Sequence, residues 1–187
     1  MSERTFFDTN IFVYADDLNE GPKCFRAQTL IEQYARTKTL VLSTQVMQEY
    51  FNAATRKMKV PAEFARWRVE SMSRYDVVLN DAAIILGAID LHRLNRISIW
   101  DALLIKAASS ANCAVLLSED LNHGQTIDGV RIENPFLPAG HAAEPRARYQ
   151  VMPELQHVEA RPPPSGPKPR ATSAKRSTAQ RGSARAR

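Results

Sequence analysis

Cysteine is scarce in this chain of 187 residues, and no long hydrophobic stretch occurs in it. Cys24 and Cys113 have no CxxC spacing and no evident histidine partner, so we expect two buried, reduced thiols and neither a disulfide nor a zinc site. No segment approaches the roughly 18 to 20 uninterrupted apolar residues of a membrane span, and the first residues lack the basic-then-apolar order of a signal peptide. These absences lead us to expect a cytoplasmic protein that does not enter a membrane.

Charge is distributed unevenly along the chain. Residues 1–144 contain 15 Lys plus Arg and 18 Asp plus Glu, a net charge of −3, whereas residues 145–187 contain 10 basic and 2 acidic residues, a net charge of +8. From residue 141 onward the sequence is rich in Pro, Ser, Ala and Arg and has few large apolar residues, so it cannot bury enough surface to fold alone. We therefore predict a folded domain at 1–140 and a disordered basic extension at 141–187.

Strand-like and helix-like segments alternate through the first 140 residues. Short apolar runs predict strands at 5–8, 39–43, 75–80, 114–118 and 130–134. Apolar periodicity and capping residues predict helices at 23–36, after Ser43 or Thr44, after Pro61, at 81–94 and at 98–111. The helix at 81–94 is so apolar that we expect it to be largely buried. Alternation of this kind predicts an α/β fold with a parallel sheet.

An aspartate stands inside the first apolar segment, RTFFDTNIFVYA at residues 4–15. Burying an unpaired carboxylate costs several kcal/mol, so something must compensate the charge of Asp8. Asp120 lies two residues beyond the strand at 114–118, and both acids therefore stand at the carboxyl ends of strands, where ligand sites of open parallel sheets lie. Neighbouring strands are about 4.8 Å apart, so the two carboxylates can share one cation if their strands pair.

Two further acids fit the same edge of the sheet. Glu49 borders the buried stripe of the helix after the second strand, and Asp101 stands in the first turn of the helix that leads into the fourth strand. Each acid also has an ordinary explanation. Asp101 fits a capping box with Ser98, Glu49 fits a helix-surface charge, and the two strand-end acids fit turn or capping residues.

The placement of four carboxylates at one edge of the sheet favours a bound cation over a separate ordinary explanation for each acid. Without a cation the four acids would repel one another. Oxygen ligands without a Cys or His cluster suit Mg²⁺, with Mn²⁺ as a substitute. Such an ion lowers the pKa of bound water and orients a phosphodiester. The residues thus predict hydrolysis of a nucleic-acid backbone.

Four motifs in order resemble a known family: FFDTNIFVYA, LSTQVMQEYFNA, SIWDALLIKAA and LLSEDLNHGQTIDGVRIENPF. Over residues 4–137 they resemble the PIN-domain ribonucleases, specifically the VapC-type toxins of bacterial toxin–antitoxin pairs. The resemblance implies a three-layer α/β/α sandwich around a parallel sheet of four to five strands, with the first and fourth strands adjacent. It also implies a Mg²⁺-dependent endoribonuclease that acts on RNA, pairs with an antitoxin protein and forms a homodimer.

The same resemblance assigns roles to individual positions. It makes four acids the catalytic, metal-binding set, the first two as principal ligands: Asp8, Asp101, Glu49 and Asp120. It makes Asn10 and Ser118 the polar residues that support them. Glu119 flanks the matched acid and is expected to be solvated, and His123 lies in a loop that can meet RNA, although an exposed histidine is more often passive.

Two other classes remain open. A haloacid-dehalogenase-type phosphohydrolase also uses an Asp after the first strand, but its second Asp is replaced here by Asn10, and no Lys stands beside LLSEDLN. A catalytically inactive PIN-like module that only binds RNA or protein would have lost one of the four acids, and all four are present.

Overall fold

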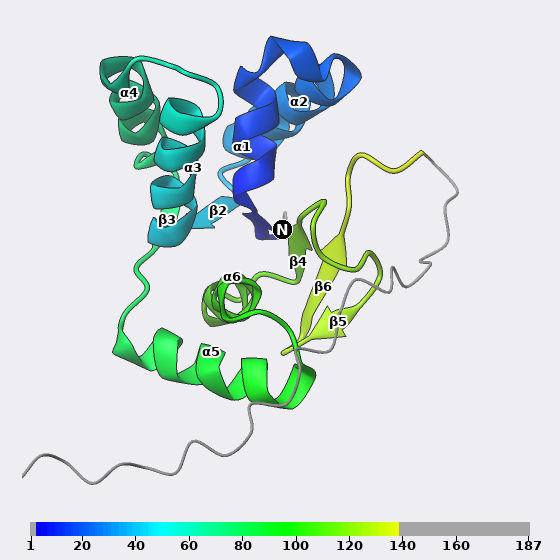
Figure 1. The fold of residues 1–187 in the computed structure, drawn as a ribbon. Helices are drawn as coiled ribbons and strands as arrows, with labels where there is room; N and C mark the ends of the chain where they lie inside the picture. Colours follow the sequence, from blue (N-terminus) through cyan, green and yellow to red (C-terminus); the bar gives the residue numbers. More distant parts are fainter. Residues whose placement is uncertain (1–2, 139–187) are drawn as a thin grey trace, which may run out of the picture. The chain divides into compact units, whose positions relative to one another are not determined.

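The computed structural model describes residues 3–138, and the predicted extension at 141–187 lies outside them. The strands are β1 (Thr5–Phe7), β2 (Leu40–Ser43), β3 (Asp76–Val78), β4 (Val115–Leu117), β5 (Thr126–Ile127) and β6 (Val130–Glu133) (Figure 1). The helices are α1 (Thr9–Asp16), η1 (Leu18–Glu20), α2 (Pro22–Arg36), α3 (Thr44–Arg56), α4 (Ala62–Met72), α5 (Ala82–Asn95) and α6 (Ile99–Ser110). The elements alternate as the sequence predicts, and the boundary at residue 140 stays a prediction.

The strands form one sheet in the order β3-β2-β1-β4-β6-β5, and every neighbouring pair is parallel except β5 with β6. β1 pairs with β4 in the register Phe7 opposite Leu117, which confirms that the first and fourth predicted strands are adjacent. The sheet has six strands where four to five were predicted, because β5 spans only two residues, too few to show an alternating pattern.

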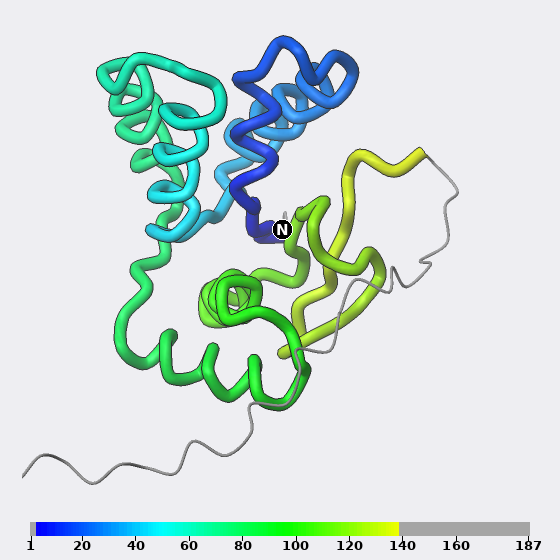
Figure 2. The backbone as a smooth tube through the Cα atoms, in the orientation of Figure 1, coloured from blue at the N-terminus to red at the C-terminus, as the bar shows by residue number. Residues whose placement is uncertain are grey.

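Helices cover both faces of the sheet, and the predicted three-layer fold is confirmed. The Phe7 ring packs against Phe12 of α1 and Tyr34 of α2, with centroids 6.2 and 5.3 Å apart. Phe6 points to the opposite face, because side chains alternate along a strand. On that side α6 contacts β2, β4 and β6, and α5 packs against α6. Figure 2 traces the same arrangement, with α1 to α4 on one side of the strands and α5 and α6 on the other.

The prediction of a largely buried α5 is wrong. Only Ile84 and Ala88 of this helix are buried, whereas Leu86 and Leu94 are 63% and 80% exposed. The helix packs on α6 and not on the sheet, so a single narrow stripe at i and i+4 is covered. Leu91 is partly buried against the core, whereas Ile85, Leu86, Ile89 and Leu94 are exposed.

The prediction that both cysteines are buried is confirmed. Cys24 and Cys113 are both buried and free. Within residues 3–138, no helix has the length and apolar character that crossing a membrane requires.

Candidate active site

Asp8 occupies the turn from β1 into α1, where it is the N-cap of the helix. Its side chain is 5% exposed, and its charge is compensated by three donors. Oδ1 accepts the backbone N–H of Thr9 at 2.6 Å, and Oδ2 accepts hydrogen bonds from Ser118 Oγ at 2.6 Å and from Asn10 Nδ2 at 3.2 Å. These hydrogen bonds stabilise the carboxylate and explain how it can be buried in an apolar segment.

Burial nevertheless dominates the protonation of Asp8. It raises the pKa from 3.8 to about 7, against the lowering effect of the hydrogen bonds from Ser118 and Thr9. The charges of Asp120 and Glu49 raise this pKa further. Two of the four predicted acids thus lie close enough to Asp8 to act on its charge.

Ser118 and Asn10 connect Asp8 to Asp120. The Ser118 hydroxyl follows β4 directly, so the β1–β4 register brings it beside Asp8, and its oxygen accepts the backbone N–H of Asp120 at 3.2 Å. Asn10 Nδ2 lies 3.5 Å from Oδ2 of Asp120. The structure therefore brings together four of the six residues that the resemblance singled out.

Glu49 reaches the same place from α3. Its Oε2 accepts a hydrogen bond from Thr9 Oγ1 at 2.8 Å, and its Oε1 accepts one from Gln45 Nε2 at 2.9 Å. Gln45 also donates to the backbone oxygen of Trp100 at 3.2 Å, which ties α3 to the start of α6. Sequence reasoning missed Thr9 and Gln45. The i,i+4 spacing of Gln45 and Glu49 was the available signal.

Asp101 lies at the start of α6, half-buried. Its backbone N–H donates to Ser98 Oγ at 3.0 Å, so the capping explanation weighed for this residue describes its local geometry. Burial raises the pKa of its carboxyl, the hydrogen bonds with Ser98 lower it, and the charges of Asp120 and Glu49 raise it. Capping does not remove Asp101 from the electrostatic cluster.

A cleft of about 410 Å³ opens over three of the acids. Asp101 is not part of its lining. Sequence reasoning missed two lining residues, Asn52 of α3 and Lys57 at the C-terminal end of that helix. The polar lining of the cleft includes Asp8, Asn10, Glu49, Asn52, Lys57 and Asp120. The cleft therefore combines carboxylates with one cationic side chain.

The donor chemistry of this cleft fits a hard divalent cation. The carboxylates of Asp8, Glu49 and Asp120 line the cleft. The buried Oδ1 of Asn10 has no hydrogen-bond partner among the described residues and is a further oxygen of the kind that such a cation binds. The side chains do not form a complete coordination sphere. Within residues 3–138, no three Asp, Glu, His or Cys residues are close enough to hold one ion. The fit thus rests on the kind of ligand atoms and on their mutual charge, not on coordination geometry.

The expectation that Glu119 is solvated is wrong. Lys23 Nζ lies 2.7 and 2.8 Å from its two carboxylate oxygens, and the Glu119 side chain is only 20% exposed. The same ammonium lies 4.8 Å from the ring centroid of Tyr14 and 5.8 Å from that of Phe136. Burial and the hydrogen bond with Glu119 raise the pKa of the Tyr14 hydroxyl. Sequence position alone did not show that α2 passes beside this loop.

Comparison with known families gives a match to the PIN domain over residues 5–126. The chain belongs to the PIN domain family. This PIN domain is also similar in fold to solved structures, although sequence identity is low, and a comparison with curated protein sequences finds no significant match. The family resemblance predicted from the four motifs is confirmed.

Two of the similar structures illustrate the extent of the likeness. The first is VapBC2 from Rickettsia felis bound to a DNA fragment from its promoter, with a TM-score of 0.52, 22% identity, and coverage of 70% of this chain and 97% of that chain. The second is a toxin–antitoxin complex from Klebsiella pneumoniae, with a TM-score of 0.53, 18% identity, and coverage of 71% and 98%. At this identity the likeness concerns the fold.

Proposed function

We propose that this PIN domain is a divalent-metal-dependent endoribonuclease and the toxin of a toxin–antitoxin pair. The observation that carries the proposal is the linkage of Asp8 to Asp120 through Asn10 and Ser118, at the carboxyl ends of two paired strands. The charges of Asp120 and Glu49 raise the pKa of Asp8, and like charges held in one cleft favour a bound cation. Family membership supports a nuclease.

The proposed metal ligands are the four acids of the cluster, and the proposed ion is Mg²⁺, for which Mn²⁺ can substitute. When bound, such an ion lowers the pKa of a water molecule and stabilises the oxyanion that leaves. Asp8 must lose its proton to act as a ligand, and a pKa of about 7 places that loss near neutral pH. The ligands would be Asp8, Asp101, Glu49 and Asp120.

The neighbouring polar residues orient these acids. Ser118 and Asn10 hold Oδ2 of Asp8, and Thr9 and Gln45 each hold one oxygen of Glu49. Lys57 lines the same cleft, and we assign it to a non-bridging oxygen of the RNA phosphate, where its charge offsets the acidic surroundings.

Similar structures that are toxin–antitoxin complexes support an antitoxin partner. We propose that the partner covers the acidic cleft with a basic side chain in place of the cation. The exposed apolar residues of α5, including Leu86, support a homodimer through that helix. We place the protein in the cytoplasm, where its RNA substrate lies.

The experiment is cleavage of total cellular RNA by the full chain with Mg²⁺, with Mn²⁺ and with EDTA, together with Asp8→Asn, Asp101→Asn and the surface control Asp90→Asn. We expect cleavage that EDTA stops, loss of cleavage in the first two variants, and full activity in the control. RNA binding without cleavage under every ion would favour the non-catalytic PIN-like module. Full activity of Asp8→Asn would overturn the site assignment.

A further inference from the structure

A second cleft, of about 630 Å³, lies between the beginning of α2 and the segment that follows β6. Its lining includes Lys23 and Arg26 of α2, His123 of the loop after β4, and Asn134 and Phe136 beyond β6. None of the four acids proposed as metal ligands lines this cleft.

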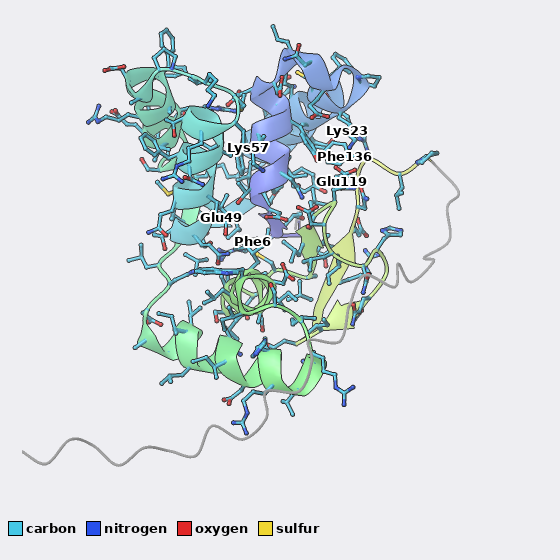
Figure 3. The ribbon with its side chains drawn as sticks, viewed as in Figure 1. Phe6, Lys23, Glu49, Lys57, Glu119 and Phe136 are labelled. Carbon is cyan, nitrogen blue, oxygen red and sulfur yellow. The ribbon has the colours of Figure 1, made fainter. Side chains whose placement is uncertain are left out.

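The second cleft is next to the acidic one. Tyr14 of α1 lines the acidic cleft, and its ring packs edge-on against Phe136 with centroids 5.2 Å apart. Glu119, which Lys23 binds, is the neighbour of Asp120 in the chain. Figure 3 shows Lys23, Glu119 and Phe136 grouped on one side of α1, with Glu49 and Lys57 on the other. A ligand longer than one nucleotide can therefore extend from the acids across Tyr14 into the second cleft.

The charged lining of the second cleft is mainly basic, and its acidic member, Glu133, is paired with Arg131 at 2.7 Å. Arg26 is exposed and makes no ion pair within the described part of the chain. His123 Nδ1 accepts the backbone N–H of Asn134 at 3.1 Å, which leaves Nε2 as the nitrogen able to donate to a ligand. Phe136 adds an aromatic ring that is partly buried.

Cations beside an aromatic ring are how proteins hold single-stranded nucleic acid, since phosphates pair with the cations and bases stack on the ring. An acidic catalytic cleft repels the phosphates on either side of the one that is cut, so RNA needs cationic contacts next to it. We infer that the second cleft is a subsite for an RNA nucleotide flanking the scissile phosphate, with Arg26 on a phosphate, His123 donating to the nucleotide and Phe136 stacking on its base. The inference rests on the proposed ribonuclease function.

The test measures binding of a fluorescein-labelled single-stranded RNA of about 10 nucleotides, within the usual site sizes, by anisotropy at several salt concentrations. The protein is the full chain carrying Asp8→Asn, with Mg²⁺ present. Adding Arg26→Gln is expected to weaken affinity about tenfold and to reduce the salt slope by about 0.7, the value for one phosphate contact on a single strand. The matched control is Arg36→Gln, an exposed arginine in the last turn of the same helix, for which affinity should stay within about twofold.

A second variant separates stacking from charge. Phe136→Leu keeps an apolar side chain and should weaken binding about tenfold without changing the salt slope, because base stacking is lost and no counterion contact is. Thermal melting of each variant checks that the fold is kept.

Several outcomes overturn the inference and remain distinct from failure of the proposed function. Equal RNA affinity for Arg26→Gln and Arg36→Gln overturns the subsite alone, provided that the wild-type chain cleaves RNA. Unchanged RNA affinity together with weakened binding of the antitoxin would show that the cleft receives a protein segment instead. Absence of any RNA binding and cleavage by the wild-type chain overturns the proposed function itself.

Discussion

Ser118 Oγ donates a 2.6 Å hydrogen bond to Oδ2 of Asp8 across the boundary between β4 and β1. The two residues are 110 positions apart in the chain, and the parallel register of the strands brings them together. Because Ser118 is fully buried, water cannot replace its hydroxyl as a donor. The strand register thus supplies the hydrogen bond from Ser118 that lowers the pKa of Asp8, against the larger raising effect of burial.

Ser118→Ala should move the proposed RNA cleavage to higher pH. The hydrogen bond from Ser118 lowers the pKa of Asp8, so its loss raises that pKa above its value of about 7. A proton then competes with the metal up to a higher pH. The measurement is the pH at half-maximal RNA cleavage, with the exposed Ser110→Ala as control. An unchanged profile would show that Asp8 does not titrate in the active enzyme.

Asp8 should make the metal-free protein less stable as pH rises. A carboxyl whose pKa is raised on folding binds its proton more tightly in the folded state, so stability falls as pH rises from about 4 to about 7. The full shift corresponds to roughly 4 kcal/mol, since one pKa unit is about 1.4 kcal/mol. Asp8→Asn removes this dependence.

The corresponding measurement is urea unfolding of both proteins in EDTA at a series of pH values. The free energy of unfolding of Asp8→Asn relative to that of the wild type should increase across this pH range. A difference that does not vary with pH would contradict the raised pKa.

Gln45→Ala should lower RNA cleavage although all four acids remain in the chain. Gln45 donates to Oε1 of Glu49 and to the backbone oxygen of Trp100, so its loss frees the Glu49 carboxylate to move. Residues that orient ligands typically change activity by about 10- to 100-fold. The measurement is the rate of RNA cleavage at saturating Mg²⁺, compared with Gln48→Ala, an exposed glutamine on the same helix. Equal rates for the two variants would remove Gln45 from the site.

The basic extension should supply long-range attraction for RNA. Residues 145–187 carry a net charge of +8, whereas residues 1–144 carry a net charge of −3. Truncation after Gly140 should weaken RNA affinity and flatten its salt dependence between about 50 and 200 mM, because fewer counterions are released. The melting temperature and the cleavage pattern should stay unchanged. Equal salt slopes for the two proteins would assign the extension no role in RNA binding.

The placement of Asp8 and Asp120 at the carboxyl ends of strands could be predicted from sequence because that signal is local, whereas the adjacency of the first and fourth strands came only from the family resemblance. Asp8 follows a recognisable strand, and the parallel arrangement follows from the alternation of elements. Thr9, Gln45 and Lys57 could not be assigned to the site this way. The i,i+4 spacing of Gln45 and Glu49 was one local signal, but which residues meet in the cleft depends on how α3 packs against α1, which no local pattern encodes.

Two wrong predictions have the same origin. The apolar composition of α5 indicated burial, yet the helix packs on α6 and exposes Leu86. Glu119 lies in a polar loop that indicated solvation, yet Lys23 of α2 lies across from it. In both cases tertiary packing, not residue type, decides exposure.

The central claim is that the acidic cluster holds the divalent ion that RNA hydrolysis requires. The most direct measurement is Mn²⁺ binding to the full chain, followed by electron paramagnetic resonance of the free ion, for the wild type and for Asp8→Asn, Asp120→Asn and Asp90→Asn. The account predicts that the wild type and Asp90→Asn bind Mn²⁺ alike and that the two cluster variants bind it at least about tenfold more weakly, since each loses a charged ligand. Equal Mn²⁺ affinity in all four proteins would contradict it.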